Sequence, residues 1–360
     1  MKYDVVLVNA HFSESTHNQR MCFPLGILYL GSLLKQAGFK IKLLDYNLNP
    51  KALLSTETEL TGLDSSVYAI TSLSSGYSFV KNIIRTIKKV SPDSRVVLGG
   101  AITYSIPELI LNQTQADIVV EGEAESFIVS LIKKLLKNDT LSKEERIIRM
   151  DKKNVVEDLD SLPFPEWSLL DTESYITKSL HAWHSVGMRS FPIMASRGCP
   201  YNCNFCCKSL GHKVRMRSSA NVAVEIKTAI DIFGIDDIWF IDEEFALTQD
   251  RVIELCDALK GLHRKLSFAC SMRVDKINDA VLKSMREAGC RRIIYGVESG
   301  SQKILNAMAK GFTVEAAERA IIATRKQGIE AYVNFMFAYP GEDEKTIRQT
   351  TDFMQRLGLY

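Results

Sequence analysis

The first part of the chain alternates short apolar runs with segments whose apolar residues recur at helical spacing. The apolar runs have the length of buried strands and cover residues 5–8, 41–44, 67–71, 96–98 and 118–120. The helical segments cover about 24–37, 77–90, 106–112 and 124–137. This alternation is typical of α/β folds, and it predicts an N-terminal Rossmann-like, doubly wound parallel sheet of five strands.

The same alternation returns in the second half. Apolar runs at strand length, each followed by a helical segment, lie at about 193–196, 237–241, 266–270, 292–295 and 332–337. Five strand-helix units in series predict a partial (β/α)6-type barrel, related in architecture to a TIM barrel. Chemistry in such barrels lies at the carboxyl ends of the strands, where this sequence places cysteines, acidic residues and an arginine.

Between the two halves the regular pattern fades. Residues 143–146 are all charged, and Pro163 and Pro165 favour an extended connector. We therefore expect a first domain at residues 1–140, a linker at 141–190 and a barrel domain at 191–360.

Composition narrows the class of protein. Of the 360 residues, 46% are hydrophobic and 24% are charged, which is ordinary for a folded soluble chain. The formal net charge of +2 gives no electrostatic reason to expect a nucleic-acid partner. No apolar stretch has the length of a signal peptide or of a membrane-spanning helix. We expect a cytoplasmic protein without a membrane span.

The cysteines supply the first candidate chemistry. Eight cysteines in this chain are too few for a disulfide scaffold. Cys199, Cys203 and Cys206 form a C-x3-C-x2-C pattern in one predicted loop, so their thiolates can converge on one metal centre. Three cysteines that hold a [4Fe–4S] cluster leave one iron open to another ligand. A zinc site with His212 as the fourth ligand is the alternative.

This loop resembles the hallmark of the radical S-adenosylmethionine (SAM) superfamily, C-x3-C-x-aromatic-C, with Phe205 as the aromatic residue. Other segments similar to that family are residues 239–245, 270–275, 288–290, 295–300 and 338–342. The resemblance implies that Cys199, Cys203 and Cys206 hold the cluster and that SAM occupies the open iron.

The resemblance also implies roles for residues at the ends of later strands. Glu243 would accept a hydrogen bond from the SAM amine. Arg273 would bind the SAM carboxylate, and Glu298 would reach the ribose or the amino group. The backbone around Phe205 would recognise adenine.

The first half is similar to the cobalamin-binding domain that precedes the barrel in one large subfamily. The similar segments are residues 24–30, 44–45, 99–100, 117–123 and, in the linker, 158–167. Because ligands of such sheets lie beyond the carboxyl ends of the strands, we expect the cobalamin contacts there, at Ser72, Ser74, Gly99, Gly100, Glu121 and Gly122. The D-x-H-x-x-G loop of other cobalamin proteins is altered around His11, so the lower ligand of cobalt stays open.

The predicted function is that of a cobalamin-dependent radical SAM enzyme. Its cluster would cleave SAM to a 5′-deoxyadenosyl radical that takes hydrogen from an unactivated carbon, and methylcobalamin would then deliver a methyl group. Cyclisation or rearrangement without net methylation is one alternative. A zinc-stabilised cobalamin- or nucleotide-binding protein is another.

The predicted partners are a small-molecule or natural-product-like substrate and an electron donor such as flavodoxin or ferredoxin. The family barrel normally has six strand-helix units, whereas this sequence contains five. We therefore expect the chain to lack the last unit and the carboxyl-terminal region that usually shapes the substrate pocket.

Overall fold

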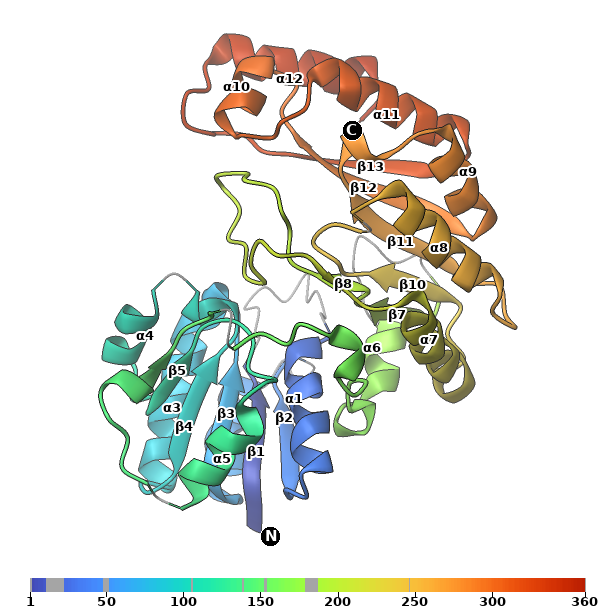
Figure 1. Ribbon diagram of the computed structural model, residues 1–360. Helices are drawn as coiled ribbons and strands as arrows, with labels where there is room; N and C mark the ends of the chain where they lie inside the picture. Colours follow the sequence, from blue (N-terminus) through green and yellow to red (C-terminus); the bar gives the residue numbers. More distant parts are fainter. Residues whose placement is uncertain are drawn as a thin grey trace. The chain divides into compact units, whose positions relative to one another are not determined.

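The computed structural model describes residues 2–10, 23–47, 52–104, 106–137, 139–151, 154–178, 187–245 and 247–359. The chain divides into two compact units, Met1–Ala182 and Trp183–Tyr360 (Figure 1). Each unit has its own sheet and is described by itself. His11 lies outside the described residues, so the structure says nothing about a histidine ligand to cobalt.

The first unit is built on one parallel sheet. Its strands, in spatial order, are β2 (Ile41–Asp45), β1 (Lys2–Asn9), β3 (Asp64–Thr71), β4 (Arg95–Gly99), β5 (Ile118–Val120) and β6 (Ile147–Ile148). The sheet confirms the doubly wound architecture, because the order reverses beside β1. The expected count of five strands was wrong. The sixth, β6, has only two residues and gains its strand conformation by pairing with β5.

Helices cover both faces of this sheet. They are α1 (Leu25–Gln36), α2 (Ala52–Thr61), α3 (Tyr77–Val90), α4 (Pro107–Gln113), α5 (Ile128–Leu136) and α6 (Thr172–Lys178), with 3-10 turns η1 (Ser74–Gly76), η2 (Ala101–Thr103), η3 (Glu144–Arg146), η4 (Leu159–Ser161) and η5 (Trp167–Leu169). Successive strand residues point to opposite faces. Val6 and Val8 therefore pack in one apolar core with α3, and Val5 and Leu7 pack in another with α1 and α5.

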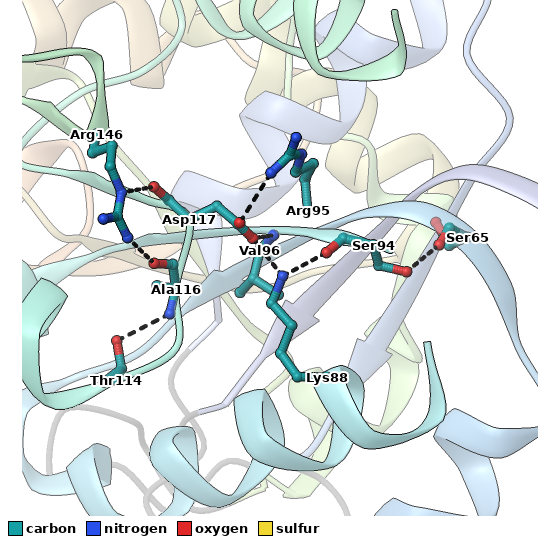
Figure 2. Close-up of polar contacts among 9 residues, drawn as sticks. All are labelled: Ser65, Lys88, Ser94, Arg95, Val96, Thr114, Ala116, Asp117 and Arg146. Carbon is teal, nitrogen blue, oxygen red and sulfur yellow. Dashed lines mark hydrogen bonds and ion pairs between the residues drawn. The ribbon is translucent and has the colours of Figure 1, made fainter. Parts of the chain in front are cut away.

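Polar contacts tie together the amino end of the sheet (Figure 2). Asp117 immediately precedes β5 and accepts hydrogen bonds from Lys88 Nζ at 2.7 Å and from the backbone N–H of Val96 at 2.7 Å. Arg95 Nη1 lies 3.3 Å from the same carboxylate, and Arg146 Nε donates to the Asp117 carbonyl. Asp117 thus fixes the starts of β4 and β5, and leaves the opposite, carboxyl end of the sheet for ligands.

The second unit is also built on a parallel sheet. Its strands, in spatial order, are β13 (Glu330–Phe335), β12 (Cys290–Glu298), β11 (Ser267–Met272), β10 (Asp237–Phe240) and β7 (Ser190–Ile193). Its other elements are α7 (Ser219–Phe233), α8 (Gln249–Lys260), η6 (Val274–Lys276), α9 (Asp279–Glu287), α10 (Gln302–Ala307), α11 (Val314–Lys326) and α12 (Glu344–Arg356). The five strands run in sequence order from one edge to the other, which confirms the partial barrel.

A two-stranded antiparallel hairpin, β8 (Ser196–Arg197) and β9 (Arg215–Met216), follows β7. The apolar run at 193–196 predicts one strand, whereas β7 ends at Ile193 and the chain turns into this hairpin. The hairpin holds the two ends of the segment that carries the cysteines. No helix in the part of the chain described above is long and apolar enough to cross a membrane.

Candidate functional site

A cavity of about 230 Å³ opens at the carboxyl ends of the strands in the second unit. It is lined by Cys199, Tyr201, Cys203, Phe205, Cys206, Lys208, Glu243, Glu244, Ser271, Met272, Arg273, Ile294, Gly296, Glu298, Lys310 and Asn334. Every residue of this half that the resemblance assigns to the cluster or to SAM lines it. The structure therefore brings these residues together from the cysteine segment and from the ends of β10, β11 and β12.

The cysteine loop, residues 198–214 between β8 and β9, is fixed at its root. Asp242 follows β10 and is buried, and its carboxylate accepts hydrogen bonds from the backbone N–H of Ala195 at 3.1 Å and from Ser196 Oγ at 2.5 Å. Burial raises the pKa of Asp242 to about 6. At the start of the loop Gly198 has φ of +91°, and a Cβ there would lie 2.4 Å from the Lys213 carbonyl, so only glycine fits.

The tip of the cysteine loop is held by other contacts. Asn204 donates through its backbone N–H to the Met308 carbonyl at 3.2 Å and through Nδ2 to the Ala307 carbonyl at 2.6 Å. The hydroxyl of Tyr339 donates to Asn204 Oδ1 at 2.6 Å. The loop is therefore attached both to the carboxyl end of α10 and to the segment that follows β13.

The three predicted metal ligands share this loop and this cavity. Cys199 and Cys203 are half-buried and Cys206 is exposed, and all three are free thiols. Burial raises the pKa of the Cys199 thiol, and the carboxylates of Glu244 and Glu243 raise it further. Within the described ranges no group of three Cys, His, Asp or Glu side chains is arranged to hold a metal ion.

The donor chemistry nevertheless fits an iron–sulfur cluster better than zinc. Soft thiolates from one loop face one cavity, and no fourth cysteine of the described residues lines it. His212, the fourth ligand of the zinc alternative, is exposed and does not line that cavity.

The acidic residues after β10 have different surroundings. Glu243 lines the cavity, as expected of a ligand-binding carboxylate. Glu244 is buried beside it and accepts a hydrogen bond from the backbone N–H of Arg273 at 3.1 Å. Burial raises the pKa of Glu244 to about 7. Glu244 therefore joins the end of β10 to the end of β11, a role that the sequence analysis did not foresee.

Arg273 and Glu298 lie where strands β11 and β12 end. Arg273 donates to both carboxylate oxygens of Asp275, at 2.9 and 3.1 Å, and its guanidinium stacks on the Tyr201 ring at 3.8 Å. Glu298 has the left-handed φ of +73° beside a register shift in β12, a strained conformation that costs energy and is concentrated at functional sites. Burial raises the pKa of Glu298, although Lys310 opposes this.

Lys310 is one of the lining residues that the sequence did not mark. It is only 7% exposed, and its Nζ lies 3.6 Å from Glu298 Oε1. The rings of Phe205 and Phe312 flank the ammonium at 5.6 and 5.5 Å. No sequence motif marked this lysine, because it lies in a short irregular segment between α10 and α11.

In the first unit the predicted cofactor residues follow β3, β4 and β5. Ser72 is buried and donates to the Ala10 carbonyl at 2.9 Å. A Cβ at Gly100, whose φ is +90°, would lie 2.5 Å from Thr71 Oγ1 and 2.8 Å from the Ser72 carbonyl. The loops after β1, β3 and β4 are therefore packed together, and glycine is required at 100 by that packing.

The other predicted cobalamin contacts of this unit lie at separate places on it. Ser74 lines an apolar cavity of about 420 Å³ with Tyr77, Ile102, Ile106, Leu109, Ile110 and Gln113. Gly99 ends β4. Glu121 pairs with Arg149 at 3.2 Å, and a Cβ at Gly122 would lie 2.7 Å from Met150, so both contact the segment after β6. An apolar cavity beside the carboxyl ends of strands suits the apolar part of a large cofactor.

Two family models match this chain in succession. Residues 3–132 match the B12 binding domain, and residues 193–354 match the Radical SAM superfamily. The two matches coincide with the two sheets described above.

Curated relatives match over most of the chain. An uncharacterised methyltransferase of Pyrococcus horikoshii is 28% identical over 347 residues, which cover 93% of this chain and 74% of that protein. The cytidylyl-2-hydroxyethylphosphonate methyltransferase of Streptomyces wedmorensis is 23% identical, with 99% of this chain and 77% of that protein covered. The anaerobic magnesium-protoporphyrin IX monomethyl ester cyclase of Cereibacter sphaeroides is 26% identical, with 91% and 55% covered.

Solved structures share the fold of both units. The radical SAM methyltransferase TsrM from Kitasatospora setae has a TM-score of 0.80 at 18% identity, with 99% of this chain and 71% of that chain covered. The cobalamin-dependent SAM radical enzyme OxsB has a TM-score of 0.77 at 23% identity, with 98% and 52% covered. The order of the two family matches, and the cysteine loop at the carboxyl ends of the barrel strands, agree with these folds. The chain belongs to the radical SAM enzymes that carry a cobalamin-binding domain, whose cofactors are a [4Fe–4S] cluster, SAM and cobalamin.

Proposed function

We propose that this chain is a cobalamin-dependent radical SAM methyltransferase that acts on an unactivated carbon of a small molecule. The observation that carries the proposal is one cavity at the carboxyl ends of the barrel strands, lined by three cysteines of a single loop, three glutamates and three cations. When bound, the cluster and SAM supply a 5′-deoxyadenosyl radical, and cobalamin supplies the methyl group.

The second unit would hold the cluster and SAM. Cys199, Cys203 and Cys206 are the proposed iron ligands, because they are the cysteines that line the cavity. Glu243 would accept from the SAM amine, and Glu298, turned into the cavity by its left-handed backbone, would accept from the ribose or the amine. The backbone around Phe205 would recognise adenine. The buried Glu244 would orient the loop that carries Arg273.

The first unit would hold cobalamin at the carboxyl end of its sheet. Ser74 lines the apolar cavity there and is the best supported of the predicted contacts. Ser72, Gly99 and Gly100 would contact cobalamin through their backbone atoms, and they would set the shape of the packed loops. Their side chains would donate no hydrogen bond to it. Glu121 and Gly122 stay predictions from the resemblance.

Cyclisation without net methylation is the second candidate, and the similarity to the Cereibacter sphaeroides cyclase favours it. The two reactions differ in what becomes of SAM. Methyl transfer would yield S-adenosylhomocysteine together with 5′-deoxyadenosine and methionine, whereas a cyclase would yield no S-adenosylhomocysteine. An electron donor such as flavodoxin or ferredoxin, and the cytoplasmic location, stay predictions.

Replacing Cys203 with alanine tests the division of roles between the units. In the reconstituted protein, Cys203→Ala should abolish formation of 5′-deoxyadenosine from SAM under reducing conditions, because a cluster ligand is lost. Cobalamin uptake, measured by absorbance after gel filtration, should remain near the wild-type level. Loss of both properties, or of neither, would contradict the assignment.

Cys207→Ala is the matched control. Cys207 is an exposed thiol next to Cys206 and does not line the cavity. The control should retain both SAM cleavage and cobalamin uptake.

A further inference from the structure

The ring of Tyr201, in the cysteine loop, stacks on the guanidinium of Arg273 at the end of β11. The guanidinium carbon lies 3.8 Å from the ring centroid, which is van der Waals contact. Every other contact between a cation and a ring in the described part of the chain is 5.1 Å or longer. Tyr201 and Arg273 therefore make the close stack that a planar guanidinium forms on an aromatic face.

Arg273 is held firmly on the β11 side of this contact. Its side chain is 8% exposed, and Nε and Nη2 donate to the two carboxylate oxygens of Asp275 at 2.9 and 3.1 Å. Nη2 also donates to the Lys310 carbonyl at 2.7 Å, and the backbone N–H of Arg273 donates to Glu244 at 3.1 Å. The guanidinium thus offers Tyr201 a fixed surface that is largely removed from water.

Tyr201 lies midway between two of the proposed iron ligands. Cys199 is two residues before it and Cys203 is two residues after it. Burial raises the pKa of the Cys199 thiol, and the backbone N–H of Tyr201 opposes this rise, so the N–H lies close to the thiol. The stack therefore bears on the part of the loop that joins Cys199 to Cys203.

Hydrogen bonds attach the cysteine loop at its root and at its tip. The backbone N–H of Cys199 donates to the Gly211 carbonyl at 3.1 Å at the root, and Asn204 binds the end of α10 at the tip. Between these points Asn202 is exposed. The stack on Arg273 joins the middle of the loop to the barrel, at a place that the other contacts do not reach.

We propose that Tyr201 is a positioning residue, whose stack on Arg273 fixes the iron ligands relative to the end of β11. This inference rests on the proposed function. Both residues line the cavity, and the resemblance predicts a contact between Arg273 and SAM. One stack thus joins the loop that would hold the cluster to a side chain on the SAM side of the cavity, and chemistry between the two needs a fixed relative placement.

A double-mutant cycle tests whether Tyr201 acts through Arg273. The readout is the rate at which the reconstituted protein, without SAM, loses iron to a chelator under anaerobic conditions. Tyr201→Leu should speed this loss about 3- to 30-fold, the effect of losing a cation–π contact that is partly removed from water. In an Arg273→Met background the same substitution should change the rate by less than about twofold, because the partner is already absent.

Two further variants separate the stack from other properties of the side chain. Tyr201→Phe keeps the ring and should retain the wild-type rate. It should also retain the electron paramagnetic resonance spectrum of the reduced cluster, which Tyr201→Leu should broaden because the loop then takes several positions. Tyr332→Leu is the matched control, since Tyr332 is half-buried, lies 5.7 Å from Arg292 and does not line the cavity. It should keep the wild-type rate and spectrum.

Arg273→Lys tests the same contact from the other side if Tyr201→Leu takes up no iron. Lysine keeps the positive charge but lacks the planar group that stacks on the ring. This variant should lose iron about 3- to 30-fold faster than the wild type. A wild-type rate in Arg273→Lys would contradict the role of the stack.

Three results of the cycle would overturn the inference. Equal effects of Tyr201→Leu in the wild-type and Arg273→Met backgrounds would mean that Tyr201 does not act through Arg273. A wild-type rate in Tyr201→Leu would mean that the stack does not position the loop. Fast iron loss from Tyr201→Phe would assign the role to the hydroxyl. A wild-type protein that takes up no iron and sulfide would refute the proposed function as well, which none of the other results does.

Discussion

At the scale of single residues, the second unit contains a carboxyl group that is almost fully removed from water. Asp242 is 4% exposed, and burial raises its pKa from an ordinary value of 3.8 to about 6. The folded state therefore binds this proton more tightly than the unfolded chain does. The contribution of Asp242 to stability is greatest below about pH 4 and is lost as the pH rises through about 6.

Asp242→Asn should remove this dependence on pH. A change in pKa from 3.8 to about 6 corresponds to roughly 3 kcal/mol. Between pH 4 and pH 7 the free energy of unfolding should therefore fall in the wild type more than in the variant. The difference between the two falls should be roughly 3 kcal/mol. Urea denaturation of both proteins before cluster reconstitution measures the difference.

The exposed Asp231 provides the control for this prediction. It pairs with His263 on the surface, where both side chains are more than half exposed. The free energy of unfolding of Asp231→Asn should fall with pH as it does in the wild type. If the free energy of unfolding of Asp242→Asn falls with pH as steeply as that of the wild type, the buried carboxyl does not cause the pH dependence.

The sequence located most site residues because they follow apolar strands in motifs. Glu243 and Arg273 could be placed at strand ends from the sequence alone. Lys310 could not, because its place in the cavity depends on two left-handed residues and on a hydrogen bond from Arg273 to its carbonyl. Such features of the backbone leave no periodic signal in the sequence.

At the scale of elements, the cysteine loop is attached at two places. The hairpin of β8 and β9 and the buried Asp242 fix its root, and Asn204 fixes its tip. A buried pair behind the root adds to this, since Arg217 Nη1 contacts Glu225 and also donates to the Met194 carbonyl at 2.8 Å. The loop is thus held in place although most of it is irregular.

Asn204→Ala should loosen the tip without unfolding the domain. The substitution removes two hydrogen bonds of an exposed side chain, and water can take over much of their contribution to stability. We expect iron to be lost to a chelator several-fold faster, whereas the midpoint of urea unfolding changes little. The measurement is the rate of colour formation with an iron chelator under anaerobic conditions.

Asn202→Ala serves as the comparison, because Asn202 is exposed on the same loop. It should lose iron at the wild-type rate. Equal rates for Asn204→Ala and wild type would mean that the contacts to α10 and Tyr339 do not help to retain the cluster.

The elements that the sequence did not predict are short or weakly apolar. β6 has only Ile147 and Ile148 next to a charged turn, and its pairing with Val119 and Val120 makes it a strand. Among the described side chains of α6, Thr172, Tyr175 and Ile176 are the buried ones, so the helical period is too brief to recognise. Both depend on contacts with distant residues, which no local pattern encodes.

At the scale of the whole molecule, the chain consists of two compact units with different proposed cofactors. The first has apolar cores on both faces of a six-stranded sheet, and the second has a five-stranded sheet with the cysteine loop at its carboxyl end. The sequence could predict both architectures, because the alternation of strands and helices is regular through each half. The domain limits at 140 and 190 stay predictions.

The most direct test of the account is the content of iron, sulfide, cobalt and zinc per chain. The protein would be purified without oxygen, reconstituted with iron, sulfide and hydroxocobalamin, and freed of unbound reagents. We predict about four irons with a matching amount of sulfide, together with one cobalt, for each chain. Zinc without iron or sulfide would contradict the account.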